Sequence, residues 1–118
     1  MTTPIEKNLT IYQGATFRQS WDLTQNNSPL DLAGWTARMQ IRQKIASDTV
    51  IHELTTENGG INIDVQPDYT RLSLYIAPAD TAAIMIKSAV YDLELVDTAG
   101  DVFRFFKGTV TIDPEVTR

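Results

Sequence analysis

The sequence predicts an all-β protein, a single antiparallel β-sandwich of seven or eight strands with one short helical crossover. Two observations carry this prediction. Apolar and polar residues alternate with a period of two along most of the chain, and turn-forming residues recur about every ten positions, the spacing of a sandwich. No segment has the length of a βαβ crossover, so we do not expect a parallel sheet.

The clearest predicted strand covers residues 35–42, where large apolar and polar side chains alternate without interruption. This pattern indicates a strand with one face buried and the other exposed. Its polar face comprises Thr36, Arg38, Gln40 and Arg42. The same period predicts further strands over residues 9–12, 17–23, 30–32, 50–54, 61–65, 71–76, 91–96 and 106–112. Trp21 and Trp35 lie on predicted core faces and are expected to be large core anchors.

The last two strands are predicted to form a hairpin. Residues 97–101 join them, and this segment contains Gly100, which can adopt a positive φ, between two aspartates that bond local backbone. Just after the turn, residues 103–106 break the alternation, so we expect a β-bulge or a change of burial there.

One stretch favours a helix. Residues 78–84 begin with Pro78 in a first-turn position, continue with an early Asp80, and are rich in alanine. We expect this helical turn to cross from one sheet to the other. The domain organisation that follows is a flexible N-terminal arm over residues 1–8, a sandwich over residues 9–113 and a C-terminal tail over residues 114–118.

Composition narrows the classes of function. The chain has no cysteine, which excludes a disulfide scaffold, a thiolate nucleophile and a cysteine-ligated zinc site. Its formal net charge of −5 argues against a general affinity for nucleic acid. No window approaches the roughly 18 apolar residues of a membrane span, so no membrane association is expected.

The sequence offers little for catalysis. His52 is the only histidine, and it lies in a predicted strand without a nucleophile elbow, so we interpret it as a surface or partly buried sheet residue. Asp92 and Glu94 are interpreted as the solvated side of a strand, and the aspartates near the turns as turn-forming residues. We expect no enzyme activity, no cofactor and no metal site.

The candidate partner-binding residues are Arg38, Arg42, Lys44, Phe103 and Phe105. Arg38 and Arg42 share the polar face of one strand, with Lys44 continuing the row, and arginine pairs well with carboxylates across an interface. The alternative is a solvated face balanced by Asp92 and Glu94. The two phenylalanines either cover a bulged part of the core or form an apolar patch for a partner.

The succession of segments resembles a family of small virion-associated proteins of tailed bacteriophages. The segments that carry the resemblance are residues 11–17, 30–42, 91–95 and 108–118, and together they span nearly the whole chain. Their order and spacing are similar to the immunoglobulin-like N-terminal module of phage baseplate upper proteins. The resemblance implies an immunoglobulin-like sandwich, localisation in the virion and a structural role.

We therefore expect a non-enzymatic interaction module in the phage tail or baseplate that docks fibres or neighbouring tail proteins. Its partners would be other virion proteins, with several symmetry-related copies present and no nucleic acid or membrane involved. A capsid decoration or neck protein that cements adjacent subunits is the first alternative. A carbohydrate-binding module at the host surface is the second, although both tryptophans are assigned to the core.

Overall fold

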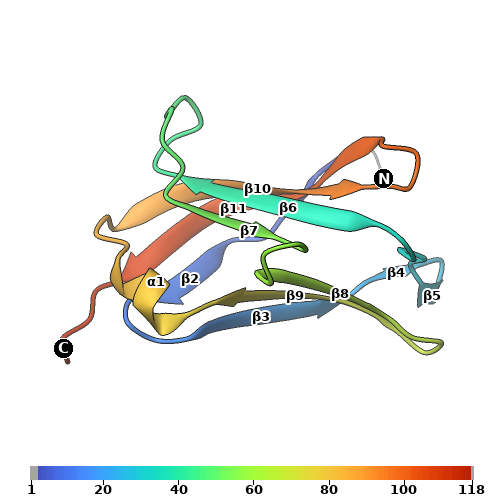
Figure 1. Ribbon diagram of the computed structural model, residues 1–118, viewed down its shortest axis with the longest axis horizontal. Coiled ribbons are helices and arrows are strands. Elements are labelled where there is room, and N and C mark those ends of the chain that lie inside the picture. The colour runs from blue at the N-terminus through green and yellow to red at the C-terminus, as the bar shows by residue number, and fades with distance from the viewer. Residues whose placement is uncertain (1–2, 118) are drawn as a thin grey trace.

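Two β-sheets pack face to face in the computed structural model, which describes residues 3–117 (Figure 1). The described chain contains eleven strands and one helix, and eight of these strands are four or more residues long. The elements are β1 (Ile5–Glu6), β2 (Leu9–Tyr12), β3 (Phe17–Asp22), β4 (Thr24–Gln25), β5 (Ser28–Pro29), β6 (Thr36–Arg42), β7 (His52–Thr55), β8 (Ile61–Val65), β9 (Thr70–Ile76), α1 (Pro78–Ala82), β10 (Ser88–Val96) and β11 (Val102–Asp113).

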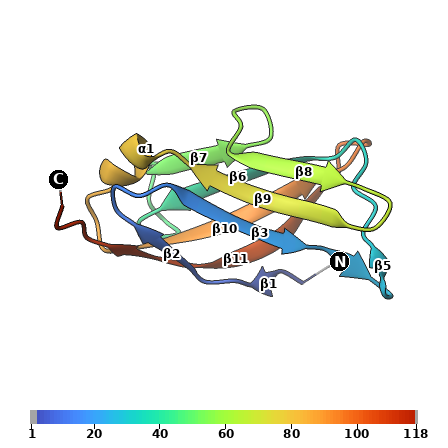
Figure 2. The same ribbon diagram turned by 90° about the horizontal axis from the view of Figure 1, so that it is seen from below.

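The larger sheet has the strand order β1-β11-β10-β6-β7, with β2 also paired to β11. The smaller sheet has the order β3-β9-β8, and β4 and β5 form a separate two-stranded ribbon. Figure 2 shows the smaller sheet lying across the larger one. Two packed sheets, one built around β11-β10-β6 and the other around β3-β9-β8, form the two-sheet sandwich of immunoglobulin-like domains. The predicted immunoglobulin-like all-β fold is confirmed.

The pairing is not purely antiparallel. Strands β1 and β2 both run parallel to β11, with Ile5 opposite Phe106 and Leu9 opposite Val110. The prediction of an all-antiparallel sandwich is wrong at this edge. The physical reason is that the first strands join the edge of a strand that lies at the far end of the sequence, so no hairpin constrains their direction.

The segment predicted as a flexible arm is paired over residues 5–8. The Lys7 amide donates a hydrogen bond to the Lys107 carbonyl at 2.8 Å, and the Thr109 amide donates to Asn8 Oδ1 at 3.0 Å. The Tyr91 hydroxyl donates to the Lys7 carbonyl. The structure therefore corrects the expected arm for these residues, while residues 1–2 lie outside the described part of the chain.

The core is formed by the inward-facing residues of both sheets. In β6 and β10 the alternation is complete, so that every second side chain is buried. The largest fully buried side chains are Phe106, Ile11, Leu32, Met39, Ile41, Leu54, Leu72, Leu74, Ile76, Leu93, Leu95 and Val110. Trp21 and Trp35 pack against this cluster but are only partly buried. The expectation that they are large core anchors holds only in part, because they contact the core from its margin while aliphatic residues and Phe106 fill its centre.

The hairpin and its bulge form as the sequence predicts. Between β10 and β11 the register places Leu93 opposite Phe106 and Glu94 opposite Arg104, which leaves Phe105 as the extra residue. In the connecting turn the Asp97 carboxylate accepts hydrogen bonds from two backbone amides, and Gly100 has a φ of 90°.

Helix α1 links the two sheets, as expected, because it follows β9 and precedes β10. The buried Thr81 holds the helix in place, since its hydroxyl donates to the Ala15 carbonyl at 2.8 Å and accepts from the Gly14 amide at 3.0 Å. The strand predicted over residues 30–32 does not form: Leu32 is buried, but the segment enters a turn closed by the Trp35 amide and the Leu32 carbonyl. In residues 3–117 no helix is long and apolar enough to cross a membrane.

The burial of Tyr91 predicts that the free energy of unfolding decreases at alkaline pH. Burial raises the pKa of Tyr91 above its ordinary value. In the unfolded chain this phenol ionises near pH 10, so above that pH the unfolded state has lost a proton that the folded state keeps. The stability contributed by the neutral phenol is full below about pH 10 and decreases as the pH rises further.

Replacing Tyr91 with phenylalanine is expected to lower stability by about 1 kcal/mol at neutral pH, through loss of the bond to Lys7, and to flatten the alkaline decrease. The measurement is urea unfolding at a series of pH values from neutral to above about pH 10. Tyr12→Phe is the control, because Tyr12 is 60% exposed. An equal alkaline slope in the Tyr91→Phe variant and the wild type would contradict this assignment.

Candidate interaction surface

The outer face of the larger sheet carries two rows of polar side chains that cross its strands. The register aligns one row as Thr55, Arg38, Glu94 and Arg104. It aligns the next row as Glu53, Gln40, Asp92, Lys107 and Glu6. We call these two rows, together with Arg42, the outer face. Charges of opposite sign are neighbours from Arg38 to Arg104 in the first row and from Asp92 to Glu6 in the second, which is the pattern that favours cross-strand pairing.

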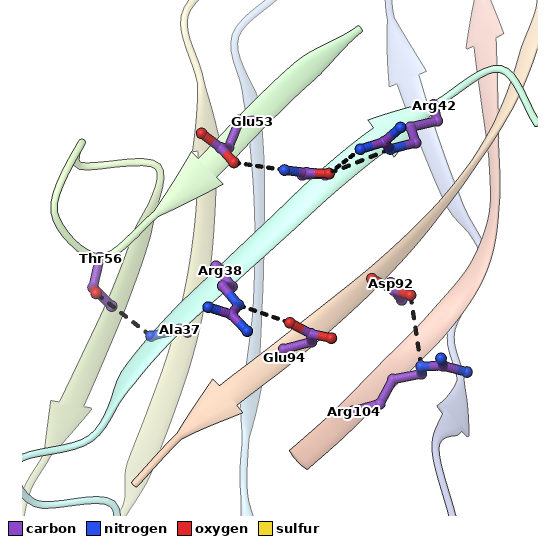
Figure 3. A network of polar contacts seen from close by, with 9 residues as sticks. Ala37, Arg38, Arg42, Glu53, Thr56, Asp92, Glu94 and Arg104 are labelled. Carbon is purple, nitrogen blue, oxygen red and sulfur yellow. Dashed lines mark hydrogen bonds and ion pairs between the residues drawn. The ribbon is translucent and has the colours of Figure 1, made fainter. Parts of the chain in front are cut away.

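Arg38 is neutralised by a partner within the chain. Its Nε atom lies 2.7 Å from Glu94 Oε1, and Arg104 lies 3.6 Å from Asp92 (Figure 3). Both arginine side chains are more than half exposed, so each pair contributes little to stability. Of the two interpretations of Arg38, the structure favours the solvated face balanced by Glu94 and Asp92.

Arg42 lies at the end of β6 and has a different environment. Its guanidinium donates to Gln40 Oε1, at 2.8 Å from Nη2, and to the Ser47 carbonyl. Gln40 in turn donates to Glu53 Oε2 at 2.8 Å (Figure 3). Arg42 is half-buried, and within residues 3–117 it has no carboxylate within ion-pairing distance. The hydrogen-bond acceptors of its guanidinium in this part of the chain are therefore all neutral oxygens.

Lys44 does not continue the row of arginines. Strand β6 ends at Arg42, and Lys44 lies in the loop between β6 and β7, where its amide donates to Ser47 Oγ at 3.1 Å. The side chain is exposed. The prediction from the strand period is wrong for Lys44 because β6 ends at Arg42, two residues before it.

The two phenylalanines have different environments. Phe105 is 6% exposed and lies 4.6 Å from Phe106, measured between ring centroids. The bulge turns Phe105 inward, so its prediction as a partner-binding residue is wrong and the alternative, a residue that covers the core, is correct. Phe103 is half-buried and stacks on Trp35 at 5.7 Å.

Three residues beside this surface were not predicted from the sequence: Glu6, Ile45 and Lys107. Glu6 and Lys107 are neighbours in register, but only the parallel pairing of β1 with β11 brings them together. Ile45 is 90% exposed in the loop after β6. The only sequence signal for Ile45 was a large apolar residue in a segment without strand periodicity.

No grouping of three or more histidine, aspartate or glutamate side chains suited to a metal ion occurs in the part of the chain that the structure describes. His52 is half-buried in β7, as predicted for a sheet residue.

On the smaller sheet, Arg71 Nε lies 2.8 Å from Asp22 Oδ1, and this hydrogen bond lowers the pKa of the Asp22 carboxyl.

Comparisons with known proteins identify no family. No protein-family model matches the sequence, and no curated protein matches it. Among solved structures, the chain is similar to the extracellular domain of the voltage-gated sodium channel beta4 subunit, whose parallel homodimers are described as explaining its role in cell–cell adhesion. That similarity has a TM-score of 0.41 at 6% identity and covers 98% of each chain. A likeness this weak says nothing about function, and the resemblance to phage baseplate proteins stays a prediction.

The different environments of the two phenylalanines predict different costs of truncation. Phe105→Ala is expected to lower the free energy of unfolding by about 3–5 kcal/mol, because it empties a buried site. Phe103→Ala is expected to cost about 1–2 kcal/mol, mainly through loss of the stack on Trp35. Denaturant unfolding of both variants checks this order. A cost for Phe105→Ala no greater than that for Phe103→Ala would show that the bulge does not turn Phe105 inward.

Proposed function

We propose that the chain is a non-enzymatic structural component of a tailed phage virion, an interaction module in the tail or baseplate that docks neighbouring tail proteins. The resemblance of its segments to the baseplate module supports the virion assignment. The fold is compatible with that resemblance, because the module it resembles is immunoglobulin-like.

The observation that carries the interaction role is Arg42. A half-buried guanidinium held by two neutral oxygens has lost part of its hydration without gaining a carboxylate. A carboxylate supplied by a neighbouring protein would complete this arrangement through the bidentate geometry that arginine favours. Arg38 lacks this potential, because Glu94 already occupies it.

This difference refines the expected role of the two arginines. A partner that binds Arg38 has to displace Glu94, whereas a partner that binds Arg42 displaces no charge. We therefore assign the anchoring role to Arg42 and a supporting role to the Arg38–Glu94 pair. Copies related by symmetry would each present the same anchor to an equivalent neighbour.

The test is complementation of a phage that lacks this chain, followed by quantification of the protein in purified particles. The wild-type chain is expected at a fixed stoichiometry. Arg42→Glu is expected to reduce incorporation at least about tenfold, because it places like charges in contact. Arg38→Glu is expected to reduce it less.

Arg18→Glu is the matched control. Arg18 is an exposed arginine on the opposite sheet, it contacts the Tyr75 ring, and it too has no carboxylate partner in the described chain. Its replacement is expected to leave incorporation unchanged, with circular dichroism confirming the fold of every variant. Complete particles that do not contain the chain would refute the virion assignment.

A further inference from the structure

A surface hollow lies between the loop after β6 and the strands at the other side of the larger sheet. The loop rises from the outer side of that sheet (Figure 1). The hollow spans β1, β11, β10 and β6, and Ile45 of the loop lines one of its sides.

Positive charge is in excess in the hollow. Three cationic side chains line it, Arg42, Arg104 and Lys107, against the carboxylates of Glu6 and Asp92. Asp92 lies 3.6 Å from Arg104. Within residues 3–117, Arg42 and Lys107 have no carboxylate within ion-pairing distance, and they line the hollow from β6 and β11. This excess is local, because the whole chain carries a net charge of −5.

Apolar surface lies beside these charges. Ile45 is 90% exposed, and Val90 on β10 also lines the hollow. An occupant that combines acidic and apolar side chains would match both features of this hollow.

The loop side of the hollow is held in place by hydrogen bonds. Arg42 donates to the Ser47 carbonyl, the Ser47 amide donates to the Lys44 carbonyl at 3.0 Å, and the Lys44 amide donates to Ser47 Oγ at 3.1 Å. Arg42 therefore also holds the loop that carries Ile45. A site ordered before binding loses less conformational entropy when the partner arrives.

We propose that this hollow binds an extended acidic segment of a neighbouring protein, with a carboxylate of that segment on Arg42 and an apolar side chain against Ile45. This inference rests on the proposed interaction role and adds the chemistry of the partner. The charge complementarity selects an acidic peptide rather than a basic one. The hollow runs over β6, β10, β11 and β1, so a chain that occupies it lies across the strands.

The probe is a random-peptide display library selected on the purified full-length chain. Selected sequences are expected to be enriched in aspartate and glutamate next to a large apolar residue. Binding of a selected peptide is expected to shift the backbone NMR resonances of Arg42, Ile45, Val90 and Lys107. Resonances of β3, β8 and β9 are expected to stay in place. Higher salt is expected to weaken binding.

Arg42→Glu is expected to lower the affinity of a selected peptide at least tenfold. Because Arg42 also holds the loop, Lys107→Glu provides a second charge reversal on β11, outside the loop, and is expected to lower affinity as well. Arg18→Glu is the matched control on the opposite sheet and is expected to bind with unchanged affinity. Replacing the acidic residues of the peptide by their amides is expected to abolish binding.

Three results would overturn the proposal: no acidic enrichment or no selected peptide, resonance shifts located on the smaller sheet, or affinity unaffected by both charge reversals. These results are separable from the virion test. Peptide binding without incorporation into particles would keep the acidic-segment site and reject the virion role. Incorporation without peptide binding would keep the virion role and reject the acidic-segment site.

Discussion

Strand β11 is paired along both of its edges, and the rest of the structure depends on this pairing. On one edge it forms the hairpin with β10, and on the other it accepts β1 and β2. A strand added to a free edge satisfies backbone groups that would otherwise remain open to other chains. At the gap between β1 and β2, the Asn8 side chain takes over the pairing and Gly108 gives the Lys7 backbone room to approach.

The same strand determines the chemistry of the outer face. The bulge at Phe105 changes which side chains of β11 face outward, so that Arg104 lies opposite Glu94 and Lys107 lies opposite Asp92. Without the extra residue, the side chains on one side of the bulge would point to the other face of the sheet. The bulge thus buries the ring of Phe105 and also places Lys107 beside Asp92 on the outer face.

The fold was predictable because its signal is local. Uninterrupted alternation defined β6 close to its observed bounds, and turn residues defined the hairpin. Both hairpin strands are longer than expected, because β10 begins at Ser88 and β11 at Val102. The pairing of residues 5–8 with β11 was not predictable, because it joins segments about a hundred positions apart, and two-residue strands carry no period. For the same reason, the neighbourhood of Glu6 and Lys107 was missed.

The candidate surface was only partly predictable. Period two placed Arg38 and Arg42 on one face correctly. It could not show that Glu94 pairs with Arg38, or that residues 3–117 place no carboxylate within ion-pairing distance of Arg42. That difference depends on the register between β6 and β10 and on the loop that supplies the Ser47 carbonyl. Phe105 was ambiguous because a bulge inverts the facing that alternation assigns.

The most direct test of the pairing of β11 is an NMR measurement of the intact chain for cross-strand contacts to this strand. The pairing predicts nuclear Overhauser contacts typical of parallel strands between Leu9 and Val110, and slow amide exchange at Lys7 and Thr109. It also predicts contacts between Leu93 and Phe106 across the hairpin. Random-coil shifts and rapid amide exchange over residues 5–8, with no contact to β11, would contradict it.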